Sequence, residues 1–295
     1  MASNASRYGL FSPILFMMPG AGDWQADAAW DDMVAIAQAA DRLGYDHLTC
    51  GEHVGIPQDQ AASRGTRYYD PLASFGYLAA VTRRIRFLTY VLVLGYSHPL
   101  QIAKRYGTLD VVSGGRLVLG LGVGSLEPEF AALGLGGIEF EERGARGDDA
   151  LRALRASWGR RVPEHHGRFY DFSDLVIDPC ATRQDVPIWI GGRSRRSLRR
   201  ALELADGWAP FGPLDGLAGM LDEARNTPAW AARNGPLEVV FRHEEAIDPI
   251  GAPIPTADTL RRLLDAGATK VNIAIPGQSC AHYIEQLEAL AALDL

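Results

Sequence analysis

Short apolar runs alternate with helical patterns along almost the whole chain, and this alternation limits the possible folds more than any other feature. The runs are apolar nearly throughout and do not change from apolar to polar at every second residue, which is typical of strands buried on both faces of a parallel sheet. Eight runs are expected to form strands, at 14–19, 46–52, 86–94, 116–124, 187–192, 207–212, 238–244 and 270–276.

The segments between these runs carry the apolar spacing of amphipathic α-helices. Such spacing is found at 30–37, ahead of Gly44, which is placed to end that helix, and again at 198–205 and 260–264. Eight strand-then-helix units predict an α/β fold, a (β/α)8 TIM barrel, in which active sites lie at the carboxyl ends of the strands. The competing fold is a doubly wound sheet, but no G-x-G-x-x-G motif opens the first unit.

The chain of 295 residues is expected to form one barrel domain over 1–295 with an insertion after the fourth strand. This insertion, 125–187, contains a helical segment at about 139–158 and then an aromatic stretch rich in turn formers. Long loops in compact domains are usually functional, so HGRFYDFSD at 166–174 predicts a small hairpin that covers the mouth of the barrel. The alternative is a hairpin that packs only on the outer helices.

Composition and charge narrow the class of protein. A hydrophobic share of 47% and a charged share of 22% indicate a globular chain. The net charge of −7, without a basic tail, argues against a nucleic-acid partner. Cys50, Cys180 and Cys280 lie far apart, which fits a reducing cytoplasm and gives no zinc motif. No signal peptide or membrane span is expected, because the apolar runs are too short for a bilayer.

Residues able to carry chemistry stand where the predicted strands end. Glu52 and His53 close the second strand, and a carboxylate beside an imidazole can move protons or hydrogen-bond a heterocycle. His98 follows the third strand, either beyond the barrel rim or as the residue that closes a turn before Pro99. Both positions are therefore candidates for the site at the barrel mouth, with His98 the weaker of the two.

Glycines follow the fourth and fifth strands. Gly122 and Gly124, ahead of Ser125, would let a flat ligand approach the backbone. The fifth strand ends on Gly-Gly-Arg-Ser at the start of a helix, where backbone N–H groups and the helix dipole favour an anion such as phosphate. These four candidate anion ligands are Gly191, Gly192, Arg193 and Ser194.

Arginines crowd the helix that follows this motif. These arginines lie off the apolar stripe of the helix and are expected to form a solvent-exposed face without a binding role: Arg195, Arg196, Arg199 and Arg200. Arg193 differs because it stands in the loop before the helix, and it is the arginine favoured as an anion contact.

Histidines and acidic residues at several strand ends also suggest a metal-dependent hydrolase as an alternative. His53, His243 and Glu52 could form a facial set of ligands, and His165 and His166 could chelate. No H-x-H pair follows the first predicted strand, where many barrel hydrolases place ligands, and adjacent loop histidines usually point apart. The expectation is therefore that the protein holds no metal.

Five stretches, GYDHLTCGEHVGIP, DPLASFGYLAAVTRRIRFLTYVLVLGYSHPLQIAK, TLDVVSGGRLVLGLGVG, IEFEERGARGDDAL and PIWIGGRSRRSLRRALELADGW, occur in this order. Together they resemble the luciferase-like monooxygenase superfamily, and most of all its actinobacterial branch of coenzyme F420-dependent oxidoreductases. The resemblance extends from about residue 10 to 212. It implies a luciferase-like TIM barrel that holds a flavin or deazaflavin at its mouth.

The resemblance also implies roles for particular residues. It implies that residues 191–194 bind the ribityl phosphate of the cofactor. It implies a bulge in the third strand, with a cis peptide bond between Tyr90 and Val91 behind the cofactor ring. Glu52 and His53 match the pair of an acid and a histidine that lies near the reactive carbon in similar deazaflavin enzymes.

One departure from the family bears on the substrate. Sugar-phosphate dehydrogenases of this superfamily carry a glutamate directly after the fourth-strand G-x-G and use it as an acid. Ser125 stands at this position in this chain. A sugar phosphate is therefore not expected as the substrate, and the proton donor is left unassigned. Aromatic and apolar residues expected near the mouth favour a less polar organic compound: Phe16, Met17, Tyr96, Phe169, Tyr170 and Phe172.

These inferences lead to one principal hypothesis about function and several alternatives. The principal hypothesis is an oxidoreductase that moves a hydride between coenzyme F420 and a small, fairly apolar organic substrate, with His53 as general acid or base and Glu52 tuning it. The alternative is a monooxygenase that uses FMNH2 and oxygen on the same scaffold. Less favoured are a flavin-binding protein without catalysis and the metal hydrolase. The resemblance further implies a homodimer.

Overall fold

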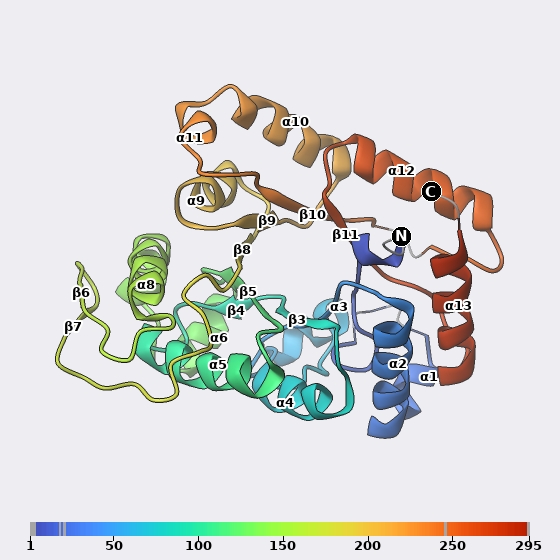
Figure 1. Cartoon of the computed structure of the whole chain (residues 1–295), viewed down its shortest axis with the longest axis horizontal. Helices are drawn as coiled ribbons and strands as arrows, with labels where there is room; N and C mark the ends of the chain where they lie inside the picture. Colours follow the sequence, from blue (N-terminus) through green and yellow to red (C-terminus); the bar gives the residue numbers. More distant parts are fainter. Residues whose placement is uncertain (1–3, 18, 20–21, 245–246, 294–295) are drawn as a thin grey trace.

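The structure is a computed structural model that describes residues 4–17, 19, 22–244 and 247–293. A barrel of short, buried strands forms its centre, with helices around it (Figure 1). The strands are β1 Tyr8–Leu10, β2 His47–Cys50, β3 Arg86–Thr89, β4 Leu92–Val93, β5 Leu117–Gly122, β8 Ile188–Gly191, β9 Gly207–Ala209, β10 Glu238–Arg242 and β11 Lys270–Ile273.

The strands are parallel and the sheet is closed. Their order is β3-β2-β1-β11-β10-β9-β8-β5-β4, and β3 also pairs with β5. Phe87 of β3 lies opposite Leu117, and Leu92 of β4 lies opposite Leu121 further along the same β5 strand. Because β3 and β4 follow one another along β5, together they occupy one strand position, and the barrel has eight strand positions. The expected α/β (β/α)8 barrel is confirmed.

One main helix follows each of the eight strand positions. The main helices are α2 Trp30–Leu43, α4 Pro71–Val81, α5 Pro99–Ser113, α8 Arg143–Ser157, α9 Arg195–Leu204, α10 Leu214–Arg225, α12 Pro253–Asp265 and α13 Cys280–Ala292. Shorter helical turns are η1 Asn4–Arg7, α1 Trp24–Asp27, η2 Gln58–Gln60, α3 Ala61–Arg64, α6 Glu127–Ala132, α7 Ile138–Glu141 and α11 Pro228–Ala231. Within the described ranges, no helix is long and apolar enough to cross a membrane.

The first strand does not lie where the sequence predicts it. The structure places it at Tyr8–Leu10, paired with β2 and β11, and not at 14–19. Ile14 has a φ of 70°, which no strand residue adopts, and residues 13–15 form a turn. Phe16 pairs with Tyr68 in an isolated bridge. The apolar run at 14–16 is buried because it packs beyond the end of β1; Met18 of the predicted strand lies outside the described residues.

The amino-terminal end of the barrel is closed by a network around Asp46. Its carboxylate binds the His47 ring at 2.7 Å, Arg86 of β3 at 2.5 Å and Lys270 of β11 at 2.9 Å. Above this network, one apolar cluster lies in the interior, made by Leu88, Val118, Trp189, Ala209 and Val240. The carboxyl end of the strands is thus the end that remains for a functional site.

The insertion after β5 forms the predicted hairpin. Strands β6 His165–His166 and β7 Asp171–Phe172 pair in antiparallel fashion, and the hairpin stands at the edge of the molecule beside α8 (Figure 1). His165 Nε2 lies 2.9 Å from Oδ1 of Asp149 on α8. The rings of Tyr170 and Phe172 lie edge-on to that of His98, at the start of α5, at 5.2 and 6.1 Å. The hairpin is anchored on the outer helices, and its closing of the mouth stays a prediction.

Candidate active site

A cis peptide bond joins Tyr90 and Val91 between β3 and β4. The Tyr90 N–H donates to the Cys50 carbonyl at 2.7 Å, and the Val91 carbonyl accepts from the Glu52 N–H at 3.2 Å. These two bonds fasten the bend to the end of β2. The bulge and the cis bond implied for the third strand are therefore confirmed, and they bring Val91 beside Glu52.

Val91 packs against glycines at the ends of two strands. A Cβ atom on Gly122 would lie 2.7 Å from Val91 Cγ2, and one on Gly191 would lie 2.6 Å from Val91 Cγ1. Gly124, with a φ of +78°, likewise leaves room for the ring of Phe130, 2.6 Å from its would-be Cβ. Protein side chains thus fill the room that these glycines leave, and cofactor contact by the glycines stays a prediction. The result is an apolar platform made by Val91, Gly122 and Gly191.

Glu52 lies half-buried beside this platform. Its Oε2 accepts from the Val93 N–H at 2.7 Å. Burial raises the pKa of the Glu52 carboxyl to about 7, and the negative charges of Asp70 and Glu129 act in the same direction. A carboxyl with this pKa both releases and takes up a proton near neutrality.

His53 is held by a glutamate that the sequence analysis did not single out. His53 Nδ1 lies 2.8 Å from Oε2 of Glu129 on α6. The other carboxylate oxygen, Oε1, accepts from the N–H groups of Val54 at 2.6 Å and Gly55 at 3.2 Å. The Tyr96 hydroxyl donates to Oε2 at 2.6 Å. One carboxylate therefore ties together the loops that follow β2 and β4.

These donors keep Glu129 ionised. Burial alone would raise the pKa of Glu129, whose side chain is 2% exposed, but the bonds from His53, Tyr96 and Gly55 outweigh it and hold this pKa at about 2. The sequence carries only a weak signal for this role, two glutamates in LEPEF. Glu127 is exposed and Glu129 is buried, and only the folded position of α6 distinguishes them.

The Gly-Gly-Arg-Ser motif forms the turn into α9, as its position predicts. Gly192 has a φ of +104°, which favours glycine. The Ser194 hydroxyl accepts from the Ser197 N–H, and the Ser194 N–H donates to Ser197 Oγ, both at 3.2 Å. The next N–H groups, of Arg195 and Arg196, have no acceptor within a helix because they belong to its first turn. These two N–H groups and the hydroxyl of Ser194 are the donors available to an anion.

The arginines around this turn differ in environment. Arg193 is exposed, and its guanidinium lies 5.4 Å from the ring centre of Phe211. The arginines at 195, 196 and 199 are exposed as predicted. The prediction is wrong for Arg200, which is buried and paired with Asp148, because α8 packs over that side of α9. Ser125, after β5, is exposed.

The remaining histidines have structural partners. His98 caps α5, with its Nδ1 accepting from the Leu100 N–H at 3.2 Å, so the turn-closing alternative is confirmed. His243 is buried, and its Nε2 accepts from the Ala274 N–H at 3.2 Å. Burial, aided by the charge of Arg242, lowers the pKa of His243 to about 4.

The metal alternative finds no support in the described part of the chain. No group of three or more His, Cys, Asp or Glu side chains there is placed to hold a metal ion. His165 and His166 bind different carboxylates, Asp149 and Asp171.

A cavity of about 320 Å³ opens at the carboxyl ends of β1, β10 and β11. Phe11 and Phe16 line it, with ring centres 4.2 Å apart, and the Arg242 guanidinium lies 3.9 Å from the Phe11 ring centre. The Tyr90 ring stands edge-on to Phe11 at 6.3 Å, which connects this cavity to the cis bend. The walls combine these aromatic rings with polar side chains, among them Gln25, Arg242 and Glu244, which suits a flat ligand that carries polar groups.

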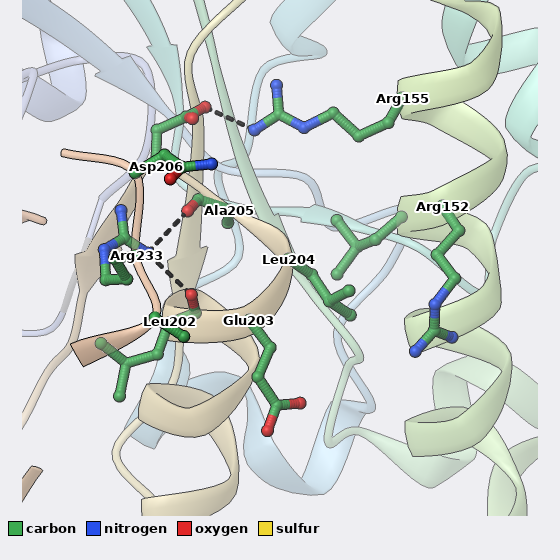
Figure 2. Close-up of a pocket in the computed structure, with 11 residues that line it drawn as sticks. Arg152, Arg155, Leu202, Glu203, Leu204, Ala205, Asp206 and Arg233 are labelled. Atoms are coloured by element: carbon green, nitrogen blue, oxygen red, sulfur yellow. Dashed lines mark hydrogen bonds and ion pairs between the residues drawn. The ribbon is translucent and has the colours of Figure 1, made fainter. Parts of the chain in front are cut away.

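A larger cavity, of about 530 Å³, lies at the opposite end of the barrel (Figure 2). Three of its charged residues, Arg155, Asp206 and Arg233, hold parts of the fold together. Arg155 pairs with Asp206 at 2.5 Å, and Arg233 donates to the carbonyls of Leu202 and Ala205 at the end of α9, at 2.9 and 3.1 Å. It shares no residue with the mouth and takes no part in the candidate site.

Comparisons with known proteins agree with this architecture. An uncharacterised protein of Mycobacterium tuberculosis is 29% identical over 251 residues, which cover 81% of this chain and 83% of that protein. The FMNH2-dependent dimethylsulfone monooxygenase of Pseudomonas putida is 28% identical over 202 residues, covering 68% of this chain and 53% of that enzyme. An F420-dependent secondary alcohol dehydrogenase, solved with an F420–acetone adduct, superimposes with a TM-score of 0.71 at 13% identity over 100% of both chains.

The family itself is shown by its sequence profile. The profile described as luciferase-like monooxygenase matches residues 8–249, which include every strand of the barrel except β11. This match, which covers most of the chain, establishes that the chain belongs to the luciferase-like monooxygenase family, whose members are oxidoreductases.

Proposed function

We propose that this protein transfers a hydride between coenzyme F420 and a small, apolar organic substrate. The observation that carries the proposal is the pair of Glu52 and His53 beside the cis bend at Tyr90–Val91. The Glu52 carboxyl, with a pKa of about 7, can move a proton near neutrality, and His53 is an imidazole held in place by a carboxylate. They stand at the carboxyl ends of the strands, where TIM-barrel enzymes carry out their chemistry.

The residues around the mouth fit a flavin-like group. The apolar platform of Val91, Gly122 and Gly191 offers a surface for a planar ring. The first turn of α9, with Ser194 at its cap and Arg193 exposed beside it, offers donors for a phosphate. Coenzyme F420 supplies hydride chemistry through its deazaflavin ring when it is bound.

The protein's own task is then to bind, orient and move a proton. In the oxidation of an alcohol, His53 Nε2 would take the hydroxyl proton while the carbon that bears the hydroxyl gives its hydride to the bound deazaflavin, and a carbonyl compound would result. In the reverse direction His53 returns that proton to the oxygen. Glu52 tunes this exchange by holding or releasing its own proton. The rings of Phe11 and Phe16 offer an apolar surface to the substrate.

The second candidate is an FMNH2-dependent monooxygenase. It is favoured by the likeness to the dimethylsulfone monooxygenase, and FMN would use the same platform and the same phosphate donors. F420 ranks first because hydride transfer to or from oxygenated carbon needs the proton exchange that Glu52 and His53 provide. Solved structures of an F420-dependent enzyme and of an FMN-containing monooxygenase both superimpose on this chain, so the fold is compatible with either cofactor.

Turnover assays test the proposal. The protein is mixed anaerobically with oxidised F420 and a series of secondary alcohols, or with reduced F420 and the matching ketones, and the deazaflavin absorbance is followed. We expect turnover with the more apolar members, and a loss of about 10²-fold or more in His53→Ala, because a general acid–base residue contributes this much. His166→Ala, on the exposed hairpin, is the matched control and should retain full turnover.

Two results would contradict the proposal. One is full turnover by His53→Ala with saturating F420, which would remove the assigned proton carrier. The other is product formation only with FMNH2 and oxygen, which would move the protein to the monooxygenases.

A further inference from the structure

We propose that Glu129 is a positioning residue that fixes the tautomer of His53, with the proton on Nδ1 and the free lone pair on Nε2. The inference rests on the proposed role of His53 and deepens it, since it states which ring nitrogen is the base. It arises from the bonds around one buried carboxylate that the family motifs did not single out.

The carboxylate of Glu129 is surrounded by donors. Two of them, the backbone N–H groups of Val54 and Gly55, bind Oε1 and can act only as donors. The other two, the His53 ring and the Tyr96 hydroxyl, bind Oε2 and can each act as donor or acceptor. The charge state of Glu129 therefore decides how His53 and Tyr96 are protonated.

An ionised carboxylate only accepts hydrogen bonds. Because Glu129 is 2% exposed and ionised, His53 must donate to it through an Nδ1–H group. A neutral imidazole carries one proton, so Nε2 is left with its lone pair. In the ranges that the structure describes, no group hydrogen-bonds to this second ring nitrogen, which leaves it open to a substrate hydroxyl.

A nearly isosteric substitution inverts this arrangement. In Glu129→Gln the amide oxygen must face Val54 and Gly55, because two fixed donors cannot accept from an NH2 group. The NH2 group then faces His53 and Tyr96 and donates to Nδ1, which moves the ring proton to Nε2. The variant keeps the shape of the site and loses the basic nitrogen.

Nitrogen NMR of the full-length protein measures the tautomer directly. Protein labelled with 15N-histidine is examined at alkaline pH, where the ring is neutral, and the His53 signals are assigned by their loss in His53→Ala. We expect Nδ1–H in the wild type and Nε2–H in Glu129→Gln. Glu127→Gln, an exposed glutamate on the same helix, is the control and should leave the wild-type pattern unchanged.

The outcomes separate this inference from the proposed function. A wild-type His53 protonated at Nε2, or a Glu129→Gln variant that keeps the Nδ1 proton, overturns the inference; the wild-type spectrum decides even if the variant does not fold. The tautomer is read without cofactor or substrate, so a confirmed pattern in a protein that does not turn over F420 would refute the proposed function alone. With both correct, Glu129→Gln lowers kcat by at least about tenfold while the KM for F420 stays within about twofold.

Discussion

At the scale of single residues, two carboxyl groups at the mouth have opposite environments. Glu52 has lost solvent and has one backbone donor, Val93, so it takes up a proton near neutrality. Glu129 is also buried but is met by donors on both oxygens, so it stays ionised. Groups whose environments separate their pKa values in this way are typical of acid–base sites. His53 adjoins both residues, since it follows Glu52 in the sequence and hydrogen-bonds to Glu129.

The raised pKa of Glu52 predicts how stability changes with pH. Between pH 4.5, its ordinary pKa, and about 7, the folded protein keeps a proton that the unfolded chain releases. Stability conferred by this group therefore falls as pH rises across that window. Glu52→Gln removes this titration. As pH rises across the window, the free energy of unfolding of the variant should therefore increase relative to that of the wild type, by at most roughly 3 kcal/mol.

Urea unfolding of both proteins at several pH values measures this gain. Glu127→Gln is the control, since Glu127 is exposed, and its difference from the wild type should not depend on pH over the same range. A Glu52→Gln difference that is also constant would show that the Glu52 pKa is not raised in the folded protein.

At the scale of elements, the site is made by connections and not by the regular strands. The cis bend between β3 and β4, the turn from β2, the short helix α6 and the cap of α9 bring the candidate residues to one end of the barrel. The strands only fix where these connections begin. This division is typical of TIM barrels, in which function depends on the loops at the carboxyl end.

The cap of α9 can be tested against a second serine cap in the same protein. Ser194 caps α9 and Ser279 caps α13, and each hydroxyl accepts from a backbone N–H at 3.2 Å. Substitution of either serine by alanine should lower stability by about 1 kcal/mol. Only Ser194→Ala should also weaken cofactor binding, by about tenfold, because it alone removes a donor to the phosphate.

Thermal unfolding and fluorescence titration with F420 or FMN provide the two measurements. Equal cofactor affinity in Ser194→Ala and Ser279→Ala would place the phosphate elsewhere, and the role given to residues 191–194 would then be wrong.

At the scale of the whole molecule, the barrel could be predicted because its strands are buried on both faces and leave continuous apolar runs. The first strand was misplaced because the buried turn at 14–16 is more apolar and more continuous than Tyr8–Leu10, which is only three residues long. Apolarity reports burial, and burial is shared by strands and by loops that pack beyond them. The hairpin, the cis bend and the capping glycine Gly44 were predicted correctly because their signals are local or follow from the resemblance.

Contacts between distant segments could not be predicted from the sequence. Glu129 is 76 positions from His53, and no local pattern distinguishes it from Glu127. The pattern of α9 alone predicts that Arg200 is exposed, whereas α8 covers it in the fold. The choice of cofactor could not be predicted either, since F420 and FMN both carry a planar ring and a phosphate, and residues suited to one are suited to the other.

The central claim is that the barrel mouth binds a deazaflavin in preference to a flavin. Side-by-side fluorescence titration of the purified wild-type protein with oxidised F420 and with FMN tests it most directly. We predict that F420 binds more tightly than FMN. Tighter binding of FMN, or binding of neither, would contradict the account: the first result would favour the monooxygenase, and the second would remove the cofactor site assigned to Val91 and residues 191–194.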